Sequence, residues 1–126
     1  IIIRKINKIF FIRPIYIISF IYLNIKLLKI MPNIVEKMTI NYSPNFYSTK
    51  RHKKKIKYLV FHYTGMKNDR LAIKKLTSQK SKVSCHYYIT KKGKLIHMVP
   101  DLYIAWHAGK SKWKKESLIN KNSIGI

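Results

Sequence analysis

The chain has 126 residues, which suits one compact domain, and its 47% hydrophobic content is enough to form a core. Its 27 Lys and Arg against 4 Asp and Glu give a formal net charge of +23, which favours an anionic partner without saying which one. The single cysteine, Cys85, excludes an intrachain disulfide and a metal site built from several thiolates.

Residues 1–38 form an Ile-rich, basic segment that differs from the rest of the chain. Basic residues precede an apolar run from Pro14 to Ile25, as in a secretion signal, but no small-residue cleavage site follows. The uninterrupted run is also shorter than the roughly 20 residues that span a membrane. Two interpretations stay open: an uncleaved anchor that contacts the membrane through residues 9–25, or upstream translation before a start at Met31 or Met38.

Residues 41–55 are predicted to form an exposed approach loop. They contain Pro44, several Ser and Asn residues and a basic cluster that includes Arg51. A strand over residues 56–63 follows, with Phe61 and Tyr63 on one face and His62 on the other. Because both faces are largely apolar, this strand is predicted to be central.

The pattern after this strand alternates between helix and strand. A helix is predicted over residues 70–78, capped by Asn68 or Asp69, and its inward stripe is Leu71, Ala72, Ile73 and Leu76. Strands over 83–90 and 95–99 are predicted to form a hairpin in which Gly93 supplies the left-handed conformation. Residues 101–122 read as a loop, and 123–126 as a further strand.

Histidines supply the candidate site residues. His62 stands at the carboxyl end of a strand, where ligands of open sheets usually lie, although a satisfied structural histidine is the alternative. Cys85 and His86 are adjacent in a strand, so they point to opposite faces, which argues against a cysteine nucleophile. His97 reads as a packed strand residue.

The string Trp106-His107-Ala108-Gly109 places an aromatic ring and an imidazole in a loop, the usual setting for a recognition surface. A tryptophan that only pins the loop to the sheet is the alternative. Asp101 and Glu116 stand in predicted loops with no obvious partner. The lack of an evident carboxylate pair argues against a glycosidase.

Five strings together resemble the zinc-dependent N-acetylmuramoyl-L-alanine amidases, which share a fold with peptidoglycan recognition proteins and phage amidase lysozymes. Each string alone is weak, but all five occur in the family's order over residues 56–126. They are Tyr58-Leu59-Val60-Phe61-His62-Tyr63-Thr64, Val83-Ser84-Cys85-His86-Tyr87, Gly93 with Val99-Pro100, Ala105 to Ser111, and Asn122-Ser123-Ile124-Gly125-Ile126.

The resemblance implies an α/β fold in which helices flank a mixed β-sheet, with residues 39–126 as the N-terminal part of the amidase domain. It implies that zinc-activated water cuts the amide between N-acetylmuramic acid and L-alanine of peptidoglycan or muropeptides, with His62 as the first zinc ligand. The residues that match the substrate groove are His86, Trp106, His107, Ala108 and Asn122.

The same resemblance implies a domain incomplete at its C-terminus, because the family's acidic catalytic residue and its other zinc ligands come after the position of Ile126. No catalytic residue is therefore assigned, and these residues alone are expected to bind zinc weakly and to hydrolyse nothing. A non-catalytic peptidoglycan-binding module is the alternative.

A nucleic-acid partner is not expected, because Tyr58 and Phe61 alternate as buried strand residues rather than as exposed stacking platforms. An export anchor would favour the periplasm or cell envelope, and the cytoplasm is the alternative.

Overall fold

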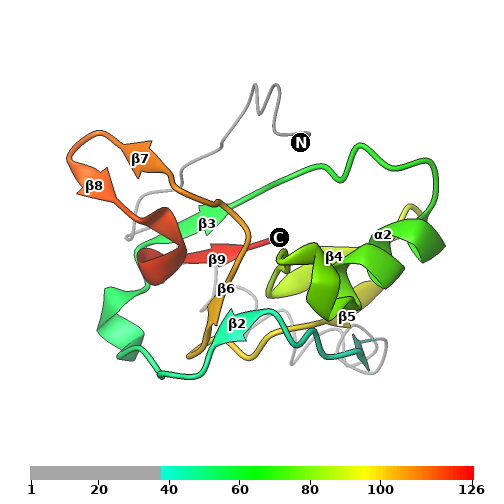
Figure 1. The fold of residues 1–126 in the computed structure, drawn as a ribbon, viewed down its shortest axis with the longest axis horizontal. Coiled ribbons are helices and arrows are strands. Elements are labelled where there is room, and N and C mark those ends of the chain that lie inside the picture. The colour runs from blue at the N-terminus through cyan, green and yellow to red at the C-terminus, as the bar shows by residue number, and fades with distance from the viewer. Residues whose placement is uncertain (1–37) are drawn as a thin grey trace, which may run out of the picture.

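The computed structural model describes residues 38–126, whose arrangement is shown in Figure 1. Their strands pair in four groups, and the predicted mixture of parallel and antiparallel strands is present. The groups are the sheet of β1 (Thr39–Ile40), β5 (Leu95–His97) and β4 (Tyr87–Ile89), and the pairs β2 (Phe46–Tyr47) with β6 (Ile104–Ala105), β3 (Tyr58–Val60) with β9 (Ser123–Gly125), and β7 (Lys112–Trp113) with β8 (Glu116–Ser117).

The predicted leader and its membrane contact through residues 9–25 lie outside the described residues. Within residues 38–126, no helix has the length and apolar content to cross a membrane.

Helix α2 (Asp69–Thr77) begins where the capping signal predicts. The Asn68 side chain accepts a hydrogen bond of 2.9 Å from the Leu71 amide, which satisfies one of the free N–H groups of the first turn. Ala72 is buried against β4 and β5, and Ile73 and Leu76 pack against the same core. Leu71 is 45% exposed, so its predicted place in the inward stripe is wrong.

The predicted hairpin is confirmed in β4 and β5, which pair antiparallel with Tyr88 opposite Ile96. Gly93 has φ +78° in the connecting turn, a conformation that favours glycine. The preceding residues 83–86 are not part of β4. Their backbone bonds instead to two other segments, through Ser84 N–H to Trp106 C=O at 3.0 Å and His86 N–H to Gly125 C=O at 2.9 Å.

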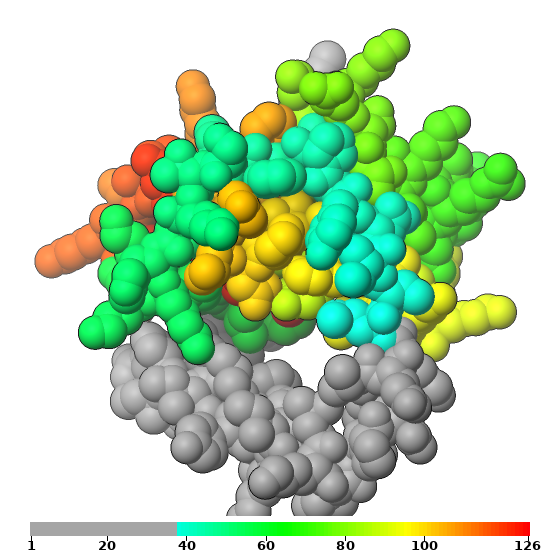
Figure 2. All heavy atoms as spheres, turned by 90° about the horizontal axis from the view of Figure 1, so that it is seen from below, coloured from blue at the N-terminus to red at the C-terminus, as the bar shows by residue number. Residues whose placement is uncertain are grey.

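The predicted exposed loop over residues 41–55 is wrong in its burial. This segment contains β2 and the 3-10 helix η2 (Lys53–Lys55), and Asn45 and Arg51 are both buried. The Asn45 Nδ2 atom donates to the Ser78 and Val83 carbonyls, each at 2.8 Å. Figure 2 shows this segment, in cyan to green, packed across one face beside the residues around 100, in yellow to orange.

The predicted strand over residues 56–63 is confirmed in part as β3. It is not central among the described residues, where it pairs in parallel with β9 alone, and Phe61 and Tyr63 are 37% and 75% exposed. β9 confirms the predicted strand over 123–126. The predicted loop over 101–122 instead contains β6, the β7–β8 hairpin and the 3-10 helix η4 (Ile119–Asn122).

Candidate functional site

A cleft of about 530 Å³ separates the segment after β3 from helix α2, strand β4 and the loop after β6. Four of the six predicted site residues line it, and they come from two segments that lie more than forty positions apart in the sequence. These four residues are His62, Trp106, His107 and Ala108.

His62 is held at the wall of the cleft by backbone bonds that continue the β3–β9 pairing. Its N–H donates to the Ile126 carbonyl at 2.7 Å, and the Ile126 N–H donates to the Val60 carbonyl at 2.8 Å. Burial lowers the pKa of His62, because removing the imidazolium from water costs free energy. The ring is therefore neutral at pH 7, the state that a metal ligand requires.

His107 brings the second imidazole to the same wall. Its backbone N–H and that of Ala108 both donate to Asn120 Oδ1, at 3.3 and 2.8 Å. Its Nδ1 atom lies 3.0 Å from Nε2 of His62, and the two rings meet edge to face with centroids 5.2 Å apart. Burial holds the pKa of His107 well below its usual value.

His86 is fully buried and lies outside the cleft lining. Its Nδ1 atom accepts from the Gly125 N–H at 3.0 Å, and its Nε2 atom lies 2.9 Å from Arg51 Nη2 and 3.1 Å from the Tyr103 carbonyl oxygen. Burial, together with the neighbouring Arg51 guanidinium, lowers the pKa of His86 to about 4. These bonds give His86 a structural role, and its predicted contact with substrate stays a prediction.

Trp106 presents an aromatic side chain to the cleft, and the exposed ring of Tyr47 meets it edge to face at 5.6 Å. Its indole Nε1 atom is buried and has no hydrogen-bond partner among the described residues. Asn122 lies outside the lining, and its Nδ2 atom donates to Glu116 Oε2 at 3.1 Å. Its predicted contact with substrate is likewise untested.

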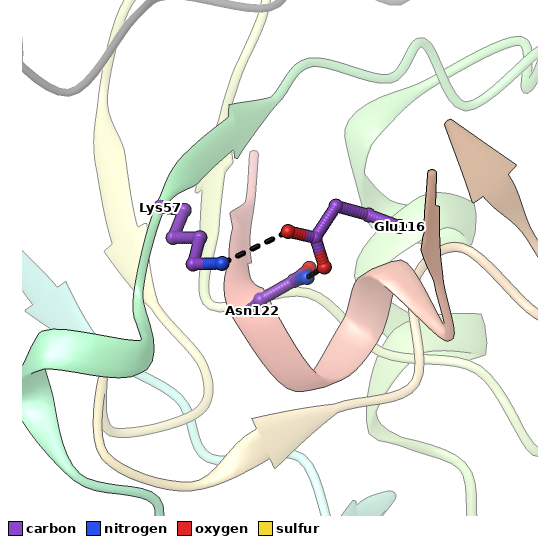
Figure 3. A network of polar contacts seen from close by, with 3 residues as sticks. All are labelled: Lys57, Glu116 and Asn122. Atoms are coloured by element: carbon purple, nitrogen blue, oxygen red, sulfur yellow. Dashed lines mark hydrogen bonds and ion pairs between the residues drawn. The ribbon is translucent and has the colours of Figure 1, made fainter. Parts of the chain in front are cut away.

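The two acidic residues that lacked an obvious partner in the sequence both have one. Glu116 accepts from Lys57 Nζ at 2.8 Å as well as from Asn122, as Figure 3 shows. Asp101 accepts from the Tyr87 hydroxyl at 2.7 Å. The sequence interpretation was wrong here because Lys57 lies 59 positions away from Glu116 and no local pattern connects them.

Cys85 is buried in the core beside Ala72 and Met98. Burial raises the pKa of its thiol to about 12, because the thiolate would lose its hydration. A thiol in this state is a poor nucleophile at neutral pH, which agrees with the sequence argument against cysteine catalysis.

The donor set for a metal ion is incomplete in the part of the chain that the structure describes. Within residues 38–126, no group of three or more His, Cys, Asp or Glu side chains could hold an ion. His62 fits one ligand position, because its ring is neutral and its Nδ1 atom has no hydrogen-bond partner among these residues. The described residues thus offer one fitting ligand rather than a closed site.

Two residues that support the histidines were missed in the sequence. The Ser123 hydroxyl lies 3.1 Å from His107 Nε2, and the His107 ring packs on the backbone of Gly125. For Gly125 a signal was present, since a glycine inside a strand often marks a close approach. For Ser123 no sequence signal stands out.

Comparisons with known proteins agree with the architecture. Residues 52–126 match the sequence model of the N-acetylmuramoyl-L-alanine amidase family. The chain is 37% identical over 79 residues to N-acetylmuramoyl-L-alanine amidase AmiD of Escherichia coli strain K12, an alignment that covers 57% of this chain and 28% of AmiD. The fold is similar to the crystal structure of a selenomethionine derivative of AmpD, with TM-score 0.56 and 22% identity over 71% of this chain and 59% of that one. This likeness confirms the predicted α/β amidase-type fold.

Proposed function

The chain belongs to the N-acetylmuramoyl-L-alanine amidase family, and from this membership we propose that it acts on peptidoglycan or muropeptides, at the amide between N-acetylmuramic acid and L-alanine. The observation that carries the proposal is the pair of neutral imidazoles, His62 and His107, in the wall of a cleft large enough for part of a peptide stem. The chain spans 28% of AmiD, so the activity itself is proposed.

We assign His62 as one zinc ligand, with the remaining donors supplied by residues other than the described ones. A bound zinc ion supplies a water of lowered pKa and polarises the amide carbonyl. His62 contributes a neutral imidazole at the end of β3, and Trp106 offers an apolar face that can cover a sugar ring and exclude water.

Proton transfer is not assigned to a described residue. Asp69 is the carboxylate that lines the cleft, and its oxygens already accept bonds from the Tyr88 hydroxyl at 2.7 Å and the Lys91 amide at 3.2 Å. A carboxylate held in this way is a structural acceptor. We therefore propose that these 126 residues alone bind zinc weakly and do not turn over, since tight zinc sites draw their binding energy from several ligands together.

The test compares His62→Ala with His52→Ala in a zinc-loaded, longer protein that includes the remaining zinc donors, because these 126 residues alone are not expected to turn over. Zinc content is measured by mass spectrometry, and release of peptide stems from purified muropeptides by chromatography. His62→Ala should lose both zinc and hydrolysis, whereas His52→Ala should keep both, because His52 is exposed and lies outside the cleft lining. Full zinc content and turnover in His62→Ala would refute the assignment.

The incomplete donor set favours one second candidate, a module that binds peptidoglycan without cutting it. In that case, muropeptide binding by the longer protein should be insensitive to a metal chelator, and that protein should form no product on prolonged incubation. Loss of binding in the presence of the chelator would decide against it.

A further inference from the structure

The two cleft histidines share one hydrogen bond whose direction is not evident from the pair alone. His62 Nε2 and His107 Nδ1 are 3.0 Å apart, and either nitrogen could carry the proton. The direction matters because it decides which nitrogen of His62 keeps a free lone pair. The neighbours of His107 settle it.

The Ser123 hydroxyl has one proton and two candidate acceptors. It lies 2.6 Å from the Ile119 carbonyl, which can only accept, and 3.1 Å from His107 Nε2. The shorter bond takes the proton, because two acceptor oxygens at 2.6 Å would otherwise repel each other. The Ser123 oxygen therefore accepts from a protonated His107 Nε2.

The rest follows from the single proton of each neutral imidazole. With its proton on Nε2, His107 has a bare Nδ1 that accepts from His62 Nε2–H. His62 then has its proton on Nε2 and a free lone pair on Nδ1. That atom has no hydrogen-bond partner among the described residues.

The backbone holds the His107 ring in place for this bond. A Cβ atom added to Gly125 would meet three atoms of the His107 ring, with Cδ2 at 2.6 Å and Nδ1 at 2.7 Å, so the ring lies directly on the Gly125 backbone. The backbone N–H groups of His107 and Ala108 also donate hydrogen bonds to Asn120 Oδ1, which holds the backbone of His107. The acceptor nitrogen that faces His62 is therefore fixed by packing as well as by hydrogen bonding.

We infer that His107 is a positioning residue: the series from the Ile119 carbonyl through Ser123 and His107 fixes the Nε2–H tautomer of His62 and leaves Nδ1 as its metal-binding atom. Histidine ligands generally donate their second ring N–H to such a partner, which orients the ring and raises its basicity. The assignment of Nδ1 as the metal-binding atom rests on the proposed function, whereas the assignment of the two tautomers rests on the hydrogen bonds alone.

The first experiment reads the tautomers directly in the metal-free 126-residue chain. Long-range 15N–1H NMR at pH 7.5 distinguishes protonated from bare ring nitrogens and should show Nε2–H for both His62 and His107. A His62 ring protonated on Nδ1, or the tautomer mixture of free histidine, would overturn the inference. This readout needs neither zinc nor hydrolysis, so it can fail while the proposed function holds, and the reverse.

Two variants then separate positioning from packing. His107→Asn can keep an acceptor oxygen where Nδ1 stands, and it should preserve the His62 tautomer, whereas His107→Leu removes the acceptor and should give a mixture. Gly125→Ala keeps every polar group but displaces the ring, so it should act as His107→Leu does. If all three variants keep the wild-type His62 tautomer, His107 does not set it.

The zinc affinity of the longer protein that includes the remaining donors, measured by titration, gives the second readout. His107→Leu should weaken zinc binding at His62 by about 10-fold or more, the usual effect of losing such a partner, and His107→Asn should recover most of the loss. Equal zinc affinity in the wild type and in His107→Leu would contradict the positioning role.

Discussion

The imidazole of His86 is shielded from water, and neighbouring groups contact both of its ring nitrogens: the Gly125 amide at Nδ1, and the Tyr103 carbonyl and the Arg51 guanidinium at Nε2. Its pKa is about 4 in the folded chain, against about 6.5 when unfolded. Between these values the unfolded state binds the additional proton, so stability rises with pH across this window. The contribution of His86 to the free energy of unfolding is fully present above about pH 6.5 and is lost as the pH falls toward 4.

We therefore expect the free energy of unfolding to fall by about 3 kcal/mol between pH 7 and pH 4 from His86 alone, since one unit of pKa shift corresponds to about 1.4 kcal/mol. The pKa values of His62 and His107 are lowered in the same direction, which steepens the loss. Urea unfolding followed by circular dichroism at several pH values checks this. His86→Asn, which can keep an acceptor for the Gly125 amide, should flatten the profile. A wild-type profile that is flat over this range would be inconsistent with a buried neutral His86.

Among single residues, the sequence predicted the place of His62 better than the burial of Arg51, while the role of His62 as a metal ligand stays a prediction. A histidine at a strand end is a local pattern, and the structure places it in the cleft wall. Arg51 was grouped with exposed lysines because its neighbours are basic, yet it is 6% exposed. Its partners lie 35 to 72 positions downstream, and no short window of sequence contains both ends of such contacts.

At the scale of elements, the Arg51 guanidinium joins three segments of the chain. It donates to the Asp101 carbonyl after β5, to the Asn120 carbonyl in η4 and to the Ser123 carbonyl at the start of β9. The planar group offers five N–H donors in a fixed geometry that an ammonium cannot copy. Burial lowers the pKa of Arg51 to about 10, so it keeps its charge at neutral pH.

Arg51→Lys should therefore destabilise the fold by roughly 2–4 kcal/mol, because buried carbonyls lose charged donors and are left unsatisfied. Denaturant unfolding measures the change, and Lys53→Arg, at an exposed basic position two residues away, is the control that should change little. If Arg51→Lys is as stable as the control, the guanidinium does not join these segments.

The β7–β8 hairpin depends on a different kind of contact. Glu116 in β8 forms an ion pair with Lys57, before β3, and accepts a hydrogen bond from Asn122 in η4 (Figure 3). The side chains of Lys57 and Glu116 are 47% and 36% exposed. Because solvent and salt weaken such pairs, we expect Glu116→Gln to leave global stability almost unchanged. Backbone hydrogen exchange over residues 112–117 should nevertheless become faster, because the side-chain carboxamide of the Glu116→Gln variant is a weaker hydrogen-bond acceptor for Asn122 than the carboxylate is. Unchanged exchange rates would mean that the hairpin is held without this carboxylate.

Elements with local signals were predicted well, and elements with remote partners were not. Helix α2 has its cap and its apolar positions within ten residues, and the β4–β5 hairpin has its turn glycine between its strands. Strands β2 and β6, by contrast, are two residues each and exist because they pair with one another across about 58 positions. A two-residue strand has no periodicity of its own, so residues 41–55 and 101–122 read as loops.

At the scale of the whole molecule, positive charge greatly exceeds negative charge. The formal net charge is +23, and the three acids within residues 38–126, Asp69, Asp101 and Glu116, already accept hydrogen bonds from partners in the fold. Such a surface attracts carboxylated muropeptides and nucleic acid alike, and the attraction is screened over about 10 Å at 0.1 M salt. Charge thus brings polyanions to the protein without selecting among them.

Selection must come from the cleft, and salt should separate the two contributions. We expect duplex DNA to bind at low ionic strength and to dissociate as salt rises toward about 0.5 M, because counterion release dominates that binding. Muropeptide binding should lose only part of its affinity over the same range. The affinity that remains at high salt should depend on Trp106, whose side chain lines the cleft. Fluorescence anisotropy with labelled ligands, in the wild type and in Trp106→Ala, measures both. DNA binding that survives high salt with a base preference, or muropeptide binding that disappears with salt as DNA binding does, would mean that the cleft does not select the partner.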